Sequence, residues 1–106
     1  MNDFEKKVQF DKKVKSAINE MMRKIGYRPS YLIKMISDDD SVVAVKSLLN
    51  GKTETYGFTT LFEKRRLDLS MENIVYSENW GDLFTEEEIS IAKKRLKDYG
   101  YLPKTA

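Results

Sequence analysis

The C-terminal part of the chain carries the signals of an amphipathic helix at both of its ends. Thr85 is a candidate N-cap, and Glu88 three residues later completes a capping box, in which two N–H groups at the helix start are satisfied reciprocally. Phe84 and Ile89 stand at the two positions of a hydrophobic staple. The charges run from acidic to basic along the segment, as the helix dipole favours, and Gly100 stands where the helix should end. The chain is therefore committed to a helix that must bury one face.

Apolar residues in the N-terminal part recur every three or four positions, which is the period of one helical face. They are Phe4, Val8, Val14, Ala17, Ile18, Met21, Met22 and Ile25. Phe10 lies beside this stripe. Gly26 and Pro29 then oppose continuation of the helix. We therefore expect a long first helix over about residues 3–25, with the stripe facing the core.

The middle of the chain predicts shorter helices joined by polar connections. Ser30 and Ser70 are candidate N-caps for two of them. Residues 58–62 predict one or two helical turns, and residues 52–56 predict a loop or a short strand. Four aromatic residues in the connections are expected to fill gaps in the core: Phe58, Phe62, Trp80 and Phe84. Five others are better candidates for a contact surface: Tyr27, Tyr31, Tyr56, Tyr99 and Tyr101.

Residues 41–46 are compatible with two structures. Val42, Val43 and Val45 have strand propensity. The spacing of apolar residues as far as Leu48 is instead that of a helix, which we favour, with a strand as the alternative.

These patterns together predict an all-α fold. The 106 residues fit one compact domain, residues 1–106, with long N- and C-terminal helices and short helices between them. Apolar residues occur in runs of at most four, whereas a membrane-spanning helix needs about 20, so we expect no membrane partner. Without a cysteine or a secretory signal at the N-terminus, a cytoplasmic location is expected.

The composition excludes several kinds of catalytic and metal-binding site. Without cysteine there is no disulfide framework, thiolate metal site or thiol nucleophile, and without histidine there is no imidazole ligand and no Ser-His-Asp triad. The acidic run at residues 38–40 lacks the alternating ligands and the glycine of a calcium loop, and we interpret it as a helix cap. Gly57 belongs to no nucleotide-binding pattern. The acidic residues are expected mainly at helix caps and on the surface, so we expect no cofactor, no metal and no enzyme activity.

The charge is divided unevenly within a net charge of +2. Residues 1–34 hold nine basic and four acidic residues, a net +5, and the remainder carries −3. A basic helix could follow a phosphate backbone, and arginines in the connection at residues 64–66 could grip a phosphate or carboxylate. The candidate contacts to nucleic acid or another partner are Lys12, Lys13, Lys15, Arg23, Lys24, Arg28, Arg65 and Arg66. The alternative, which we favour, is a solvated helix face with local pairing such as Glu20–Lys24, because nucleic-acid domains usually carry a larger basic excess.

Three short segments form a recognisable pattern. They read G-F-T-T-L at residues 57–61, R-L-D-L-S-M-E at 66–72 and L-F-T at 83–85. Over about residues 25–101 the chain resembles a small helical domain that recurs in uncharacterised bacterial proteins, with the pattern G-F-x-x-L, R-L-D-L-[ST]-x-E and L-F-[ST]. The resemblance implies a bacterial origin and a helical fold, and no catalytic or binding residue, because the function of that family is unknown.

The sequence therefore favours a non-enzymatic interaction or accessory module whose partner is another protein. The alternative is a nucleic-acid-binding protein that uses the basic N-terminal helix. A hydrolase that uses surface carboxylates is a distant third. The oligomeric state is left open by the sequence.

Overall fold

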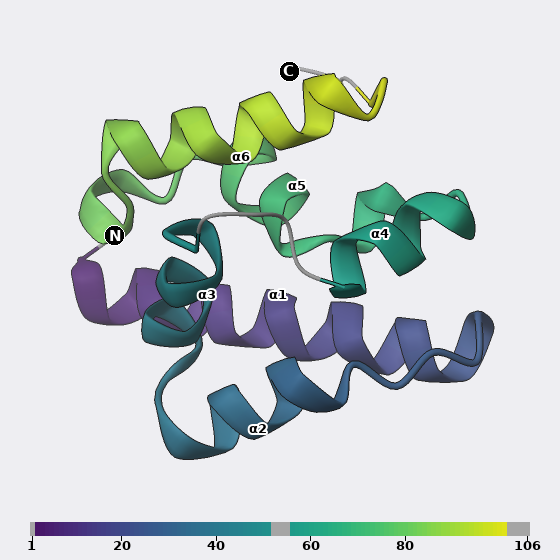
Figure 1. Ribbon diagram of the computed structural model, residues 1–106. Helices are drawn as coiled ribbons and strands as arrows, with labels where there is room; N and C mark the ends of the chain where they lie inside the picture. Colours follow the sequence, from purple (N-terminus) through teal and green to yellow (C-terminus); the bar gives the residue numbers. More distant parts are fainter. Residues whose placement is uncertain (1, 52–55, 102–106) are drawn as a thin grey trace.

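The computed structural model describes residues 2–51 and 56–101, and these residues form an all-α fold without strands (Figure 1). The α-helices are α1 (Asp3–Lys24), α2 (Ser30–Asp38), α3 (Ser41–Leu49), α4 (Tyr56–Glu63), α5 (Met71–Ser77) and α6 (Glu86–Asp98). Two short 3₁₀ helices complete the fold, η1 (Leu67–Leu69) and η2 (Gly81–Leu83). The predicted fold class and the two long terminal helices are confirmed. A loop or short strand was predicted at residues 52–56. Residues 52–55 lie outside the described residues, and the prediction is wrong for Tyr56, which is the first residue of α4.

The helix starts follow the local capping signals in most cases. The side chain of Asp40 accepts a hydrogen bond from Val43 N–H, and that of Ser70 accepts one from Asn73 N–H. Thr85 and Glu88 form the complete capping box. Residues 41–49 are helical, so the strand alternative is wrong. The prediction for Ser30 is also wrong: it is the first residue of α2, and Pro29 before it supplies no side-chain cap.

The helices pack in layers around α5. Figure 1 shows α1 and α6 on opposite sides of the molecule, with α5 between them. In the same view α3 crosses α1, and α2 lies on the side of α1 that faces away from α6. The closest packing is between α5 and α6, and α1 packs against α3. Every α-helix contributes buried side chains to the core, and the buried one of α2 is Leu32. The largest fully buried side chains include Phe10 and Phe58.

The buried face of α1 matches the predicted stripe at Val14, Ala17, Ile18 and Met21 but departs from it at the N-terminal end. Phe10 is completely buried, whereas Phe4 and Val8 are 74% and 38% exposed. The cause is tertiary: the ring of Phe10 packs edge-on against Trp80, with centroids 5.0 Å apart, and also contacts Phe84. The stripe prediction is therefore wrong for Phe4, Val8 and Met22, the last of which is 37% exposed.

The predicted aromatic core is confirmed for three of its four members, Phe58, Trp80 and Phe84. Phe62 is 43% exposed and packs edge-on against the ring of Tyr99, so its assignment to the core is wrong. Trp80 is held by a 2.8 Å hydrogen bond from its indole N–H to the carbonyl of Ile74. This bond fixes the connector that closes over Phe10.

Two helices end in the same hydrogen-bond pattern with different residues. After α6, Gly100 has a φ of 76°, and the N–H of Tyr101 donates to the carbonyl of Leu96. After α4, Arg65 occupies the equivalent position with a φ of 59°, and Arg66 N–H donates to Leu61. A left-handed backbone at this position closes the helix end and favours glycine. The second ending therefore stores strain that the first avoids.

Candidate functional site

Four of the eight predicted contact cations are engaged in ion pairs. Lys13 Nζ lies 2.6 Å from a carboxylate oxygen of Glu78, and Lys15 Nζ lies 2.9 Å from Asp11. The predicted Glu20–Lys24 pair forms at 4.0 Å. These contacts reduce the positive field that α1 can offer to a phosphate backbone.

Arg66 is held most firmly of the predicted cations. Its guanidinium binds Glu20 of α1 at 2.5 Å and Asp68 at 3.0 Å. These two carboxylates, Asp68 first, raise the pKa of Arg66 above its ordinary value. Arg66 therefore joins the turn after α4 to α1, and its Nε and Nη2 donors are already occupied.

The other four predicted cations are exposed and form no ion pair among residues 2–51 and 56–101. They are Lys12, Arg23, Arg28 and Arg65. Lys12 and Arg23 are eleven positions apart, about three turns, and so share the outer face of α1. Arg28 stands in the turn between α1 and α2, and Arg65 follows α4. The structure does not bring all four together on one helix face.

Glu88 has a second role besides capping α6. It is the predicted capping-box residue, but its side chain is buried and also binds Lys46 Nζ at 2.7 Å and the amide of Asn50 at 2.8 Å. Burial alone would raise the pKa of Glu88, but hydrogen bonds from Lys46, the Thr85 N–H and Asn50 outweigh it, and the pKa is lowered. This carboxylate therefore links the start of α6 to the end of α3.

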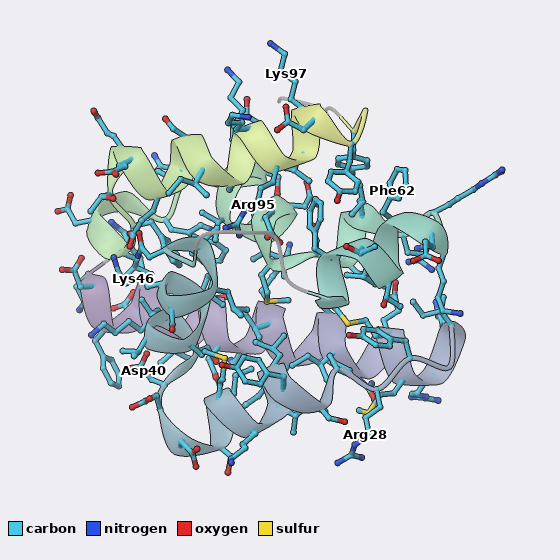
Figure 2. All side chains as sticks on the ribbon, viewed as in Figure 1. Arg28, Asp40, Lys46, Phe62, Arg95 and Lys97 are labelled. Carbon is cyan, nitrogen blue, oxygen red and sulfur yellow. The ribbon has the colours of Figure 1, made fainter. Side chains whose placement is uncertain are left out.

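A second buried carboxylate, Glu72, lies deeper in the molecule. It accepts a 3.1 Å hydrogen bond from the guanidinium of Arg95, which is buried too. Arg95 also donates to the carbonyls of Leu48, Leu49 and Gly51, and so satisfies the end of α3 (Figure 2). The expectation that acidic residues lie at helix caps or on the surface is wrong for Glu72, because its partner Arg95 comes from a helix distant in the sequence. Glu88 caps α6 as predicted, but its side chain is buried rather than exposed.

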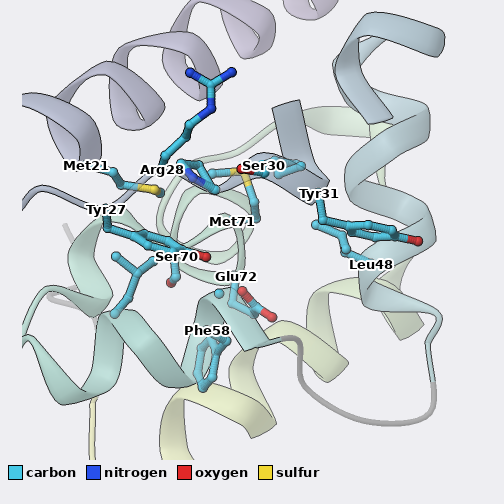
Figure 3. Close-up of a pocket in the computed structure, with 14 residues that line it drawn as sticks. Met21, Tyr27, Arg28, Ser30, Tyr31, Leu48, Phe58, Ser70, Met71 and Glu72 are labelled. Atoms are coloured by element: carbon cyan, nitrogen blue, oxygen red, sulfur yellow. The ribbon is translucent and has the colours of Figure 1, made fainter. Parts of the chain in front are cut away.

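A pocket of about 520 Å³ opens between the α1–α2 turn, α3, α4 and α5. Figure 3 shows the side chains around it. The lining consists of Met21, Tyr27, Arg28, Pro29, Ser30, Tyr31, Leu32, Leu48, Gly57, Phe58, Leu61, Ser70, Met71 and Glu72. Most of this lining is hydrocarbon or aromatic, and the volume lies in the range of about 300–1,000 Å³ that is typical of ligand sites.

The described polar groups of the pocket floor are bonded to the protein itself. Ser70 donates its hydroxyl to the carbonyl of Leu67 at 2.7 Å and accepts from Asn73 N–H. The carboxylate of Glu72 is bound to Arg95. Because these groups are already satisfied, the pocket can receive an apolar group without leaving them unpaired.

The sequence did not identify this pocket, although it identified part of its rim. Tyr27 and Tyr31 were expected on a contact surface, and both line the pocket, Tyr27 half-buried and Tyr31 70% exposed. The remaining lining comes from segments as distant as α1 and α5. The one local signal is the turn with Gly26 and Pro29, which brings Tyr27 and Tyr31 to the same opening.

Other kinds of site receive no support from the described residues. Residues 2–51 and 56–101 contain no group of three or more acidic side chains that could hold a metal ion. None of the helices that the structure describes is both long and apolar enough to cross a membrane.

Comparison with models of protein families, with curated proteins and with solved structures found no match. The resemblance to a recurring bacterial helical domain therefore stays a prediction. The fold and the site define a small all-helical domain with an open apolar pocket.

Proposed function

We propose that this protein is a non-enzymatic interaction module of the cytoplasm that holds an apolar part of a partner protein in the pocket. The observation that carries the proposal is an open pocket lined by core side chains. The apolar side chains that line such a pocket are in contact with water while it is empty of a partner. A partner that fills the pocket removes this apolar surface from water, which is favourable in free energy.

The walls of the pocket suit a protein partner. Met21 of α1 and Met71 of α5 both line it, and methionine side chains adapt their shape to different apolar surfaces. The rim residues Ser30 and Tyr31 are exposed on α2, so a bound segment would extend across them. Tyrosine contributes large contact area at interfaces and keeps its hydroxyl in water.

Nucleic-acid binding is the weaker alternative. Half of the cations that would carry it are paired with carboxylates, and Arg66 is bound by two of them. Its test is the binding of a labelled DNA duplex and a labelled RNA strand at low and high salt. Binding that falls steeply as salt rises would favour this alternative over a protein partner, and no binding at low salt would remove it.

The pocket is tested with a neutral apolar dye, N-phenyl-1-naphthylamine, whose fluorescence rises when it leaves water. We expect saturable binding to the full chain. Leu48→Trp places a large ring in the pocket and should weaken binding about tenfold or more, since burial of one large side chain involves about 1.5–3 kcal/mol.

The matched control is Val43→Trp, which adds the same ring to an exposed position of the same helix outside the pocket lining. Circular dichroism of both variants verifies that they fold. Equal dye binding by Leu48→Trp and Val43→Trp would reject the pocket as the binding site.

A further inference from the structure

The mouth of the pocket is positively charged. This charge bears on the chemistry of the partner, and what we infer from it rests on the proposed function. Arg28 stands at the rim, and its guanidinium extends away from the floor that Glu72 forms (Figure 3). Arg28 is exposed and forms no ion pair with a described residue. Glu72 is the one acidic residue in the described lining, and it is buried against Arg95.

The next cation along the chain after Arg28 adds positive charge to α2. Lys34 lies on this helix one turn after Ser30, where it is exposed. The carboxylate of Glu20, one turn before Lys24, is already bound to Arg66 at 2.5 Å. No carboxylate of the described lining is therefore available to neutralise Arg28.

The start of α2 contributes in the same direction. Pro29 and the first three residues of α2, Ser30 to Leu32, line the pocket, and the first turn has neither a side-chain cap nor an acidic residue. The N-terminal end of a helix carries partial positive charge from its unpaired N–H groups. The mouth thus presents this end together with the Arg28 guanidinium, next to a cavity that is mainly apolar.

We propose that the pocket recognises an acidic amphipathic segment of a partner protein. Two bulky apolar side chains, one helical turn apart, enter the cavity, and glutamate or aspartate residues beside them meet Arg28 and the start of α2. A volume of about 520 Å³ has room for more than one such side chain. Binding of this type is the helix-in-groove mode, in which apolar anchors recur at helical spacing.

The test uses three fluorescein-labelled peptides and the full chain. The first carries leucine and phenylalanine anchors one turn apart among glutamates. The second has every glutamate replaced by lysine, and the third keeps the glutamates but has serine at the anchors. Fluorescence anisotropy measures each affinity at low and at moderate salt. We expect the first peptide to bind at least about tenfold more tightly than either of the others.

Variants locate the charge effect at the rim. Arg28→Glu should weaken the acidic peptide about threefold to tenfold and strengthen the lysine peptide, because one exposed pair changes from attraction to repulsion. Lys12→Glu makes the same change in net charge on the outer face of α1 and should leave both affinities within about twofold. Rising salt should reduce the difference between the acidic and lysine peptides.

The failures of the two proposals are distinguishable. If both charged peptides bind equally to the wild type and both are lost in Leu48→Trp, the acidic class is wrong and the apolar pocket stands. If the dye binds in the pocket and the acidic peptide does not bind at all, the acidic class is wrong as well. If the acidic peptide binds Leu48→Trp as well as it binds Val43→Trp, binding occurs elsewhere and both proposals fail.

Discussion

Arg95 of α6 and Glu72 of α5 form an ion pair at 3.1 Å with both side chains almost excluded from solvent. The same guanidinium satisfies three backbone carbonyls at and after the end of α3. One side chain therefore connects α6 to two other helices, and Glu72 also forms part of the pocket floor.

Arg95→Met is expected to destabilise the protein by about 3–5 kcal/mol, because it leaves the Glu72 carboxylate buried without its partner. Urea unfolding measures the change. The control is Lys97→Met on the same helix, whose side chain points into solvent (Figure 2) and whose loss should cost at most about 0.5 kcal/mol. Similar losses in the two variants would contradict the assigned role of Arg95.

The burial of the N-terminal end of α1 is tested by the same change at two positions. Phe10→Ala removes a fully buried ring that contacts Trp80 and Phe84, and we expect a loss of about 3–5 kcal/mol. Phe4→Ala removes a ring that is 74% exposed and should change stability by no more than about 0.5 kcal/mol. Thermal unfolding of both variants measures which ring is buried. A larger loss of stability for Phe4→Ala than for Phe10→Ala would show that the predicted stripe is the buried face.

Acidification should weaken the link between α3 and α6. Because the folded state lowers the pKa of Glu88, this group contributes stability that is present above its ordinary pKa of 4.5 and is lost as the pH falls through the lower folded value. Asp11, whose pKa is lowered chiefly by the hydroxyl of Ser41, acts in the same direction from its ordinary value of 3.8. Glu88→Gln should cost about 1 kcal/mol at neutral pH and make the loss below about pH 4.5 shallower.

Urea unfolding across the acidic range measures this effect. Glu86→Gln is the control, because it removes the same charge from an exposed position in the same first turn. An unchanged acid dependence in Glu88→Gln would show that Glu88 contributes nothing to it.

Arg65→Gly is expected to stabilise the protein by about 0.5–1 kcal/mol. A left-handed backbone costs a residue with a Cβ about 1–2 kcal/mol, and the greater freedom of glycine in the unfolded chain cancels part of the gain. Lys64→Gly, one position earlier and without a positive φ, should instead destabilise by about 0.5–1 kcal/mol. Equilibrium unfolding compares the two, and a loss of stability in Arg65→Gly would contradict the strain at this turn.

Much of the helical organisation was predictable from the sequence, but the site was not. The caps at Asp40, Ser70 and Thr85 were recognised because a cap depends only on the next three residues. The same argument failed at Ser30, where the preceding Pro29 became the boundary residue. The rim tyrosines Tyr27 and Tyr31 were expected on a contact surface, but no local pattern indicated the pocket behind them.

The sequence by itself determined an all-α chain, most of its helix limits and the absence of histidine and cysteine chemistry, because these follow from composition and from interactions within one or two helical turns. Only the tertiary structure decided that Phe10 rather than Phe4 is buried, that Glu72 and Glu88 lie inside, and that Met21 and Met71 face one pocket. Each of these depends on which helices meet and at what rotation. Helical periodicity specifies that a face is apolar, but the packing partner selects which of its residues are covered.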